Sequence, residues 1–195
     1  MLLLKNVQAL NDTSARNVLR RASDASHRRM HELKPFARIG DGTLLISHYR
    51  LLLESLYIFH SAVGEAADQN GLSSVSSSKR RLELLHSDIT ALGDTVPIPV
   101  SDWNVGTSDS VLGALYVAEG SMLGGRVIAR QLDYLFGPQQ EGRRFFFGEK
   151  SDHARWSRLL AMLGHKCTNP HALNAAIDGA QSTFDWFELC VTAYS

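Results

Sequence analysis

Residues 115–130 read Leu115-Tyr116-Val117-Ala118-Glu119-Gly120-Ser121-Met122-Leu123-Gly124-Gly125-Arg126-Val127-Ile128-Ala129-Arg130. Apolar residues continue at helical spacing beyond this stretch to Leu135, which predicts one continuous helix. Gly120, Gly124 and Gly125 fall inside it, and each glycine in a helix interior costs about 1 kcal/mol relative to alanine. A helix that carries this cost either bends or presents bare backbone to a closely approaching body. That body is a neighbouring helix or a flat ligand.

Helical periodicity dominates the rest of the chain, which shows no convincing alternating strand or hairpin turn. The predicted helices cover residues 13–34, 43–68, 79–92, 108–136, 152–164 and 170–192. The second is apolar nearly all round, which predicts deep burial. With no internal repeat and no linker long enough to separate domains, we expect a single all-α domain over residues 1–195, a bundle of six or seven helices.

Proline, glycine and capping residues set the expected helix ends. The first helix is expected to stop at Lys34-Pro35, and the glycine-bearing helix at Gly137-Pro138. A charged and aromatic connector, residues 141–150, follows. Ser151-Asp152 is expected to cap the next helix, and Asn169-Pro170 supplies a cap and a first-turn proline for the last one.

Composition narrows the class of protein. The chain has 195 residues, of which 44% are hydrophobic, and this predicts a globular domain with a sizeable core. Lys and Arg number 20, as do Asp and Glu. This balance argues against a dominant surface for nucleic acid or membranes, although a local basic patch is compatible with it.

Cys167 and Cys190 have neither a disulfide framework nor metal-ligand spacing, which favours a reducing compartment. The apolar run at residues 1–4 is too short for a secretory signal. No uninterrupted apolar run approaches the roughly 18 residues expected of a membrane span. We therefore expect a cytoplasmic protein.

Two histidines on the first helix carry the first chemical hypothesis. His27 and His31 are four residues apart and share a helix face. They are compatible with an ordinary solvated face, with a two-histidine metal clip that needs further ligands, or with a single axial haem ligand at His27. Small residues, Ala22, Ser23 and Ala25 among them, surround His27 and suit the approach of a flat disc.

Other polar candidates carry weaker hypotheses. Glu54, His60, Glu119 and Asp185 contain no Glu-x-x-His pair, so a carboxylate-bridged di-iron site has little support. Cys190 lies between Leu189 and Val191 and is expected in the core. The remaining histidines belong to no constellation.

Together, the two helices resemble the haem oxygenase family. The histidine segment Ala22-Ser23-Asp24-Ala25-Ser26-His27 is similar to the family's Ala-Thr-x-x-x-His, with Ser for Thr. Gly120, Gly124 and Gly125 match its Gly-x-x-x-Gly-Gly. The sequence of residues 119–125 is most similar to that of the bacterial branch of the family, whose members are often found beside bacteriophytochromes. The resemblance covers about residues 14–192 and includes the order of the helices and the gap between the motifs.

The resemblance implies a haem-oxygenase-like helical bundle and a haem-degrading monooxygenase. Haem would be both cofactor and substrate, bound through its iron by His27 on the proximal side, with Ser23, Gly125 and Arg20 also in the haem site and Arg20 against a propionate. Gly120, Ser121 and Gly124 would form the catalytic distal face. The products would be biliverdin, carbon monoxide and ferrous iron.

The resemblance also implies partners. The sequence contains no Gly-x-Gly-x-x-Gly motif and no cysteine cluster, so electrons would come from a ferredoxin or an NADPH-dependent reductase. A bacteriophytochrome could accept the biliverdin, and neither nucleic acid nor a membrane is expected as a partner.

One residue departs from the pattern of many family members. Many carry an aspartate after the first distal glycine, where this chain has Ser121. Proton delivery would then rely on ordered water and backbone. The departure keeps open a non-catalytic haem carrier on the same fold. A helical bundle that binds only a protein partner, with the glycines as packing contacts and His27 on the surface, is a third alternative.

Overall fold

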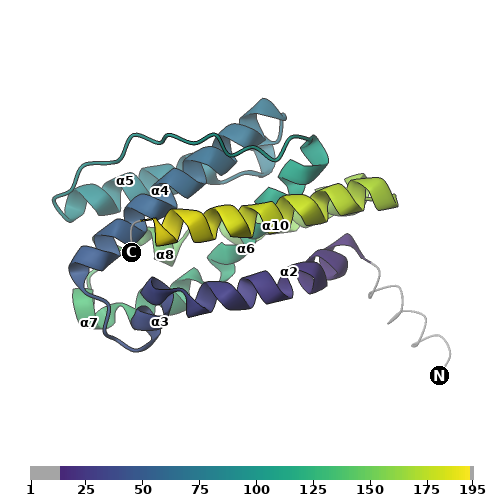
Figure 1. Ribbon diagram of the computed structural model, residues 1–195. Helices are drawn as coiled ribbons and strands as arrows, with labels where there is room; N and C mark the ends of the chain where they lie inside the picture. The colour runs from purple at the N-terminus through teal and green to yellow at the C-terminus, as the bar shows by residue number, and fades with distance from the viewer. Residues whose placement is uncertain (1–13, 194–195) are drawn as a thin grey trace, which may run out of the picture.

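The computed structural model describes residues 14–193, and over that range the chain is all-helical (Figure 1). The short apolar run at residues 1–4 lies outside this range. The helices are α2 (Ala15–Glu32), α3 (Lys34–Gly40), α4 (Ile46–Gln69), α5 (Ser78–Ala91), α6 (Ser108–Gln131), α7 (Asp133–Phe136), α8 (Arg144–Phe147), α9 (Asp152–Lys166) and α10 (Pro170–Thr192), with a 3-10 turn at Ser73–Val75.

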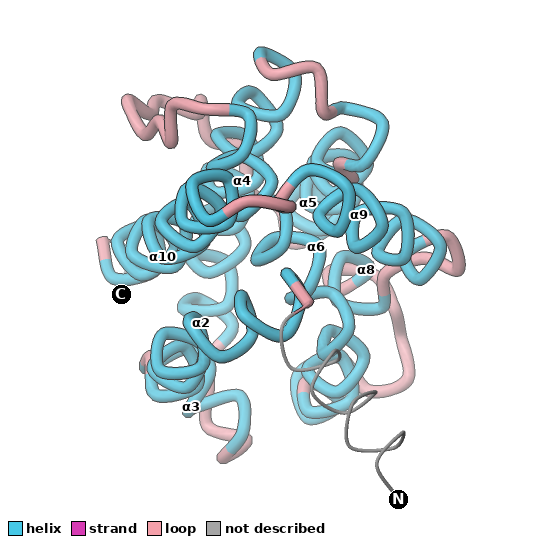
Figure 2. The backbone as a smooth tube through the Cα atoms, turned by 90° about the vertical axis from the view of Figure 1, so that its right-hand side faces the viewer, coloured by secondary structure: helices cyan, strands magenta, loops and turns pink. Residues whose placement is uncertain are grey.

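Helix α6 is the central element of the bundle. Seen end-on in Figure 2, it lies between α10 and α2 on one side and α9 and α8 on the other. It is long and apolar enough, by length and composition, to cross a membrane, but 56% of its most apolar window is buried inside this structure. Burial against α4, α8, α9 and α10 accounts for its apolarity.

Two further glycines bring α6 and α10 into backbone contact. A Cβ on Gly113 of α6 would overlap the carbonyl of Ala176, and a Cβ on Gly179 of α10 would overlap the carbonyl of Ser110. Only glycine fits at both positions. The close crossing holds α10 tightly against the first half of α6 and leaves the glycine-rich second half to face other elements.

The described residues form nine α-helices, more than the six or seven expected. The first helix ends at Glu32, close to the expected stop at Lys34-Pro35. Pro35 then opens the additional helix α3, where its missing N–H costs nothing in the first turn. The helix expected over 108–136 is interrupted at Leu132 and continues as the short α7, which ends at Gly137 with a φ of +58°. The aromatic connector contains α8.

The two expected caps differ in outcome. Asn169 caps α10, because its side chain accepts a hydrogen bond from the Ala172 N–H at 2.9 Å. Ser151 occupies the expected N-cap position of α9, but its side chain makes no capping hydrogen bond. The neighbouring Asp152 carboxylate instead accepts from the Glu149 N–H at 2.7 Å and pairs with Arg81 at 2.7 Å.

Candidate functional site

A cavity of about 430 Å³ opens between α2 and the glycine-rich half of α6. Its size is in the range of small-molecule and cofactor pockets. Most of the wall is apolar and aromatic, with side chains from α3, α4, α8 and α10. The lining residues are His27, Met30, His31, Phe36, Ile39, Leu56, Phe59, His60, Val117, Gly120, Ser121, Met122, Gly124, Gly125, Val127, Ile128, Gln131, Phe145, Phe146, Phe184 and Phe187.

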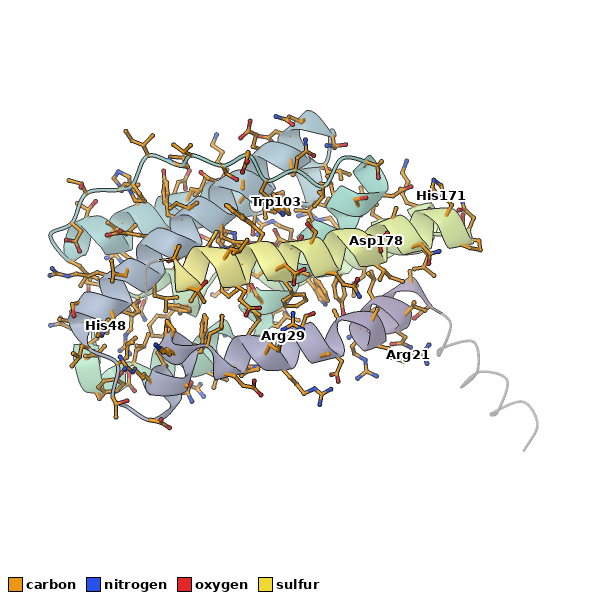
Figure 3. All side chains as sticks on the ribbon, viewed as in Figure 1. Arg21, Arg29, His48, Trp103, His171 and Asp178 are labelled. Carbon is orange, nitrogen blue, oxygen red and sulfur yellow. The ribbon has the colours of Figure 1, made fainter. Side chains whose placement is uncertain are left out.

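Helix α2 carries His27 to one wall of this cavity. Leu19 and Met30 bury the inner face of α2, and Arg29, labelled in Figure 3, reaches α10, with its guanidinium 3.4 Å from Asp185 and 3.7 Å from Glu188. These contacts fix which face of α2 is turned toward the cavity, and His27 lies on that face. Burial lowers the pKa of His27, the neighbouring His31 lowers it further, and Asp24 opposes both. His27 is therefore neutral near pH 7, the form in which imidazole binds a metal.

The glycines of α6 have different neighbours. A Cβ on Gly124 would meet nothing within 4 Å, so no protein contact explains the bare backbone there. A Cβ on Gly125 would lie 2.6 Å from the Phe146 carbonyl oxygen, so Gly125 allows α8 to pack against α6. At Gly120 the added atom would lie 3.4 Å from the Trp156 ring, an ordinary contact. All three line the cavity, but only Gly124 faces open space.

Ser121 lies next to Gly120 with its hydroxyl already engaged. Its Oγ donates a hydrogen bond to the Ala118 carbonyl at 2.8 Å, back along the helix. The hydroxyl hydrogen is thus used by the backbone, and the oxygen lone pairs are what Ser121 offers to the cavity.

Two of the residues expected in the site do not line the cavity. The Ser23 hydroxyl donates to the Leu19 carbonyl at 2.7 Å, and Ser23 is buried within the bundle. Arg20 is exposed and lies beyond the lining residues, near Tyr116. Ser23 therefore hydrogen-bonds within its own helix and does not reach the cavity. Arg20 belongs to a separate cluster of side chains.

That cluster brings Tyr116 together with Arg16 and Arg20, and the sequence analysis missed the first two. Burial raises the pKa of Tyr116, while the nearby charges of Arg16 and Arg20 lower it. The Tyr116 ring lies against Trp156, with centroids 5.4 Å apart, and Trp156 also faces Gly120. Tyr116 stands one turn before Gly120, and Arg16 one turn before Arg20, so helical spacing from the recognised residues is the signal that could have found them.

His60 reaches the cavity from α4, and the sequence analysis considered it only for a di-iron site. Its side chain is 2% exposed, and Nδ1 has no hydrogen-bond partner among the described residues. Burial, followed by the charge of Arg81, lowers the pKa of His60 to about 3. A neutral imidazole with an unpaired nitrogen is therefore held at the cavity wall.

Arg81, whose charge acts on His60, belongs to a buried cluster of polar side chains. The Arg81 guanidinium is fully buried, donates to the Ser77 hydroxyl at 3.1 Å and pairs with Asp152. Glu119 accepts from both the N–H and the hydroxyl of Ser77, at 2.6 and 2.8 Å. Burial raises the pKa of Glu119, against the Ser77 hydrogen bonds and the charge of Arg81.

A di-iron site finds no support in this arrangement. The described residues contain no group of three or more histidines, cysteines or acidic side chains that could hold a metal ion. Asp185 pairs with Arg29 instead, and Glu119 is engaged by Ser77. An apolar cavity that is lined by histidines and, within residues 14–193, by no carboxylate fits an iron that brings its own equatorial ligands, as haem iron does.

Comparison with solved structures identifies the fold. A heme oxygenase from Neisseria meningitidis, in NO- and CO-bound forms, superposes with a TM-score of 0.77 at 19% identity, covering 93% of this chain and 92% of that one. Heme oxygenase-1 from the cyanobacterium Synechocystis, in complex with heme, gives a TM-score of 0.73 at 15% identity, with the same coverage. A heme oxygenase from Leptospira interrogans gives 0.71 at 15% identity, covering 93% of this chain and 100% of that one. At these identities the likeness establishes the fold alone.

Sequence comparison is more specific. No protein-family model matches the chain. A heme oxygenase from Xanthomonas campestris pv. campestris is 36% identical over 119 residues, which are 59% of this chain and 69% of that protein. Together with the all-helical fold and the cavity between the histidine helix and the glycine-rich helix, this relationship shows that the chain belongs to the haem oxygenase family.

Proposed function

We propose that this protein opens the haem ring to biliverdin, releasing carbon monoxide and ferrous iron, with dioxygen and external electrons. The observation that carries the proposal is the cavity between α2 and α6, into which both His27 and the open backbone of Gly124 face. A haem-degrading monooxygenase needs an iron ligand on one helix and an unobstructed face on the other, and the described residues supply both.

The residues present fit haem. The cavity is apolar over most of its wall, as a porphyrin requires, and His27 brings a neutral imidazole to it from α2. His27 would bind the iron. Haem, when bound, supplies the iron that activates dioxygen and is itself the molecule that is opened.

Gly120 and Gly124 would keep the distal side close to the ring without side chains in the way. Bare backbone there restricts where oxygen can lie. We assign Gly124 the larger part, because nothing else in the described structure explains the absence of a side chain at that position.

Proton supply in this proposal uses His60 together with Ser121. Ser121 can accept a hydrogen bond from water but has its own hydrogen committed to Ala118. His60 lines the same cavity, and burial, followed by the charge of Arg81, keeps its imidazole neutral, so the ring can exchange hydrogen bonds with water there without adding a charge. This arrangement replaces an aspartate after Gly120 by water held between a serine, a neutral histidine and backbone.

Tyr116, Arg16 and Arg20 would hold the propionates. An arginine can hold a carboxylate by two parallel hydrogen bonds, and a phenol adds a third donor. Haem has one apolar edge and one acidic edge that carries the propionates. The cavity would take the apolar edge, and the cluster, which lies beyond the lining residues, would take the propionates. Ser23 and Gly125 would support the site from behind, through the backbone of α2 and the packing of α8.

The proposal extends to partners and setting. Electrons would come from a ferredoxin or an NADPH-dependent reductase, and a bacteriophytochrome would accept biliverdin, in keeping with the bacteriophytochrome-associated branch that residues 119–125 resemble. A single domain over residues 1–195 would work in the cytoplasm, supported by Cys167 and Cys190, which are both free.

One spectroscopic experiment tests the proposal. Hemin is added to the protein, the visible spectrum is recorded, and ascorbate or a reductase is then added in air. A shifted Soret band that decays as the absorbance of biliverdin grows supports the enzyme. A Soret band that shifts and then stays stable identifies a haem carrier, and no shift at all identifies a bundle without a haem site.

A further inference from the structure

Two aromatic rings stand edge-on to the imidazole of His27. His31, one turn further along α2, has its ring centroid 5.0 Å from that of His27, with an interplanar angle of 80°. Phe184 of α10 lies 6.4 Å away at 81°. Asp24 also bears on His27 electrostatically, but its carboxylate is paired with Arg28 at 3.1 Å. The ring contacts of His27 in the described part of the chain therefore come from two different helices and are both perpendicular.

Each of the two neighbours is held in its own way. Phe184 is 7% exposed and belongs to the hydrophobic core, so packing fixes its rotamer. His31 is exposed, but the spacing of four residues keeps its ring over the same face of α2 as His27. A rotation of the His27 ring about its own axis would drive an edge of that ring into one neighbour or the other.

We propose that His31 and Phe184 form a clamp that fixes the plane of the His27 imidazole, and that both are positioning residues for the iron ligand. The inference rests on the proposed function, in which His27 binds the iron. Groups beside a metal-bound histidine commonly set its ring orientation, usually through a hydrogen bond. Here, ring packing from two helices, α2 and α10, takes that part.

The plane of an axial imidazole matters because its π orbital is perpendicular to the ring and overlaps with only one iron d orbital at a time. A fixed plane therefore makes the iron's unpaired electron density unequal across the porphyrin in one constant direction. A ring free to rotate would average that direction. With haem bound, the clamp would therefore give the iron one constant electronic axis.

The test uses the full protein loaded with hemin and cyanide, whose haem-methyl proton resonances report the imidazole plane. We expect His31→Ala and Phe184→Leu each to change the order or the spread of the methyl shifts. His31→Phe keeps a ring edge and should restore the wild-type pattern. Phe36→Leu is the matched control, since Phe36 lines the same cavity and contacts Phe187 but not the His27 ring.

Each outcome decides between the alternatives. Methyl shifts that stay at wild-type positions in both His31→Ala and Phe184→Leu would overturn the clamp, as would an equal change in Phe36→Leu. His31 is exposed, so its variants keep the test valid if Phe184→Leu fails to fold. A His27→Ala protein with an unchanged spectrum would instead remove the ligand assignment of the proposed function, and the clamp with it.

Discussion

His27 and His60 line the same cavity in different environments. His27 lies on the accessible face of α2, and its pKa is lowered by the partial burial of its ring and by His31. His60 is 2% exposed beneath Phe59 and Phe145, and its pKa is lowered to about 3. Both imidazoles are neutral near pH 7, but only His27 is accessible enough to bind a metal in an approaching disc. Environment, rather than residue type, assigns the two histidines their proposed roles.

Replacing His27 by alanine should remove the iron ligand and leave the apolar cavity intact. We expect His27→Ala to bind haem more weakly, with an altered Soret band, and to lose turnover. Added imidazole should restore part of the activity by occupying the vacated position. Hemin titration and turnover in air measure both effects. Wild-type turnover by His27→Ala without imidazole would contradict the assignment and make His31 the next candidate.

Adjacent glycines on α6 provide a matched pair for separating function from packing. Gly124→Ala meets no neighbour and should stabilise the haem-free protein by up to about 1 kcal/mol through helix propensity, while weakening haem binding or turnover. Gly125→Ala places a Cβ 2.6 Å from the Phe146 carbonyl oxygen and should destabilise the same apoprotein. Thermal unfolding without haem and turnover with it are measured on both variants. A strongly destabilised Gly124→Ala apoprotein would mean that this glycine serves packing instead.

At the scale of elements, Asp88 of α5 holds α8, which carries Phe145 and Phe146 to the cavity wall. Its two carboxylate oxygens accept from the N–H groups of Arg144 and Phe145, at 2.9 and 2.8 Å. Asp88 is fully buried, and burial raises its pKa from 3.8 to about 6 despite these hydrogen bonds. The aromatic wall of the cavity is therefore held in place by a carboxylate whose pKa is well above the usual value for aspartate.

This shift predicts a pH dependence of stability. Between about pH 4 and about pH 6 the folded chain binds the Asp88 proton and the unfolded chain does not, so the free energy of unfolding falls as the pH rises across this window. The fall from this group is up to about 3 kcal/mol. Asp88→Asn cannot exchange that proton, so the stability of the wild type should decline relative to the variant over the window. Urea unfolding of both proteins at several pH values checks this, and parallel pH profiles would contradict it.

Helical elements were predictable from the sequence where local patterns decide them. The last helix has the expected limits, and Asn169 caps it as expected. Errors arose where a local stop competes with tertiary packing. Pro35 ends one helix pattern but also opens another, and the short α8 depends on Asp88, which is 56 residues away from Arg144. Patterns within one window carry no information about such a partner.

At the scale of the whole molecule, sequence motifs located the two helices that face each other but not everything between them. His27 and Gly124 were recognisable because each stands in a local motif. Tyr116 was not singled out, and His60 was weighed only for a di-iron site, because the roles proposed for them depend on neighbours on other helices, Arg20 and Arg81. The close α6–α10 crossing at Gly113 was likewise hidden, since a single glycine among apolar residues shows no partner in the sequence.

In the proposed function, haem is bound and opened in the cavity between α2 and α6. The decisive measurement is a single-turnover reaction of the hemin-loaded protein with ascorbate in air, with biliverdin and carbon monoxide both quantified. We expect the Soret band to be lost while biliverdin and carbon monoxide appear in equimolar amounts with the hemin consumed. Bound hemin that survives the reaction unchanged, or that bleaches without yielding biliverdin, would contradict it.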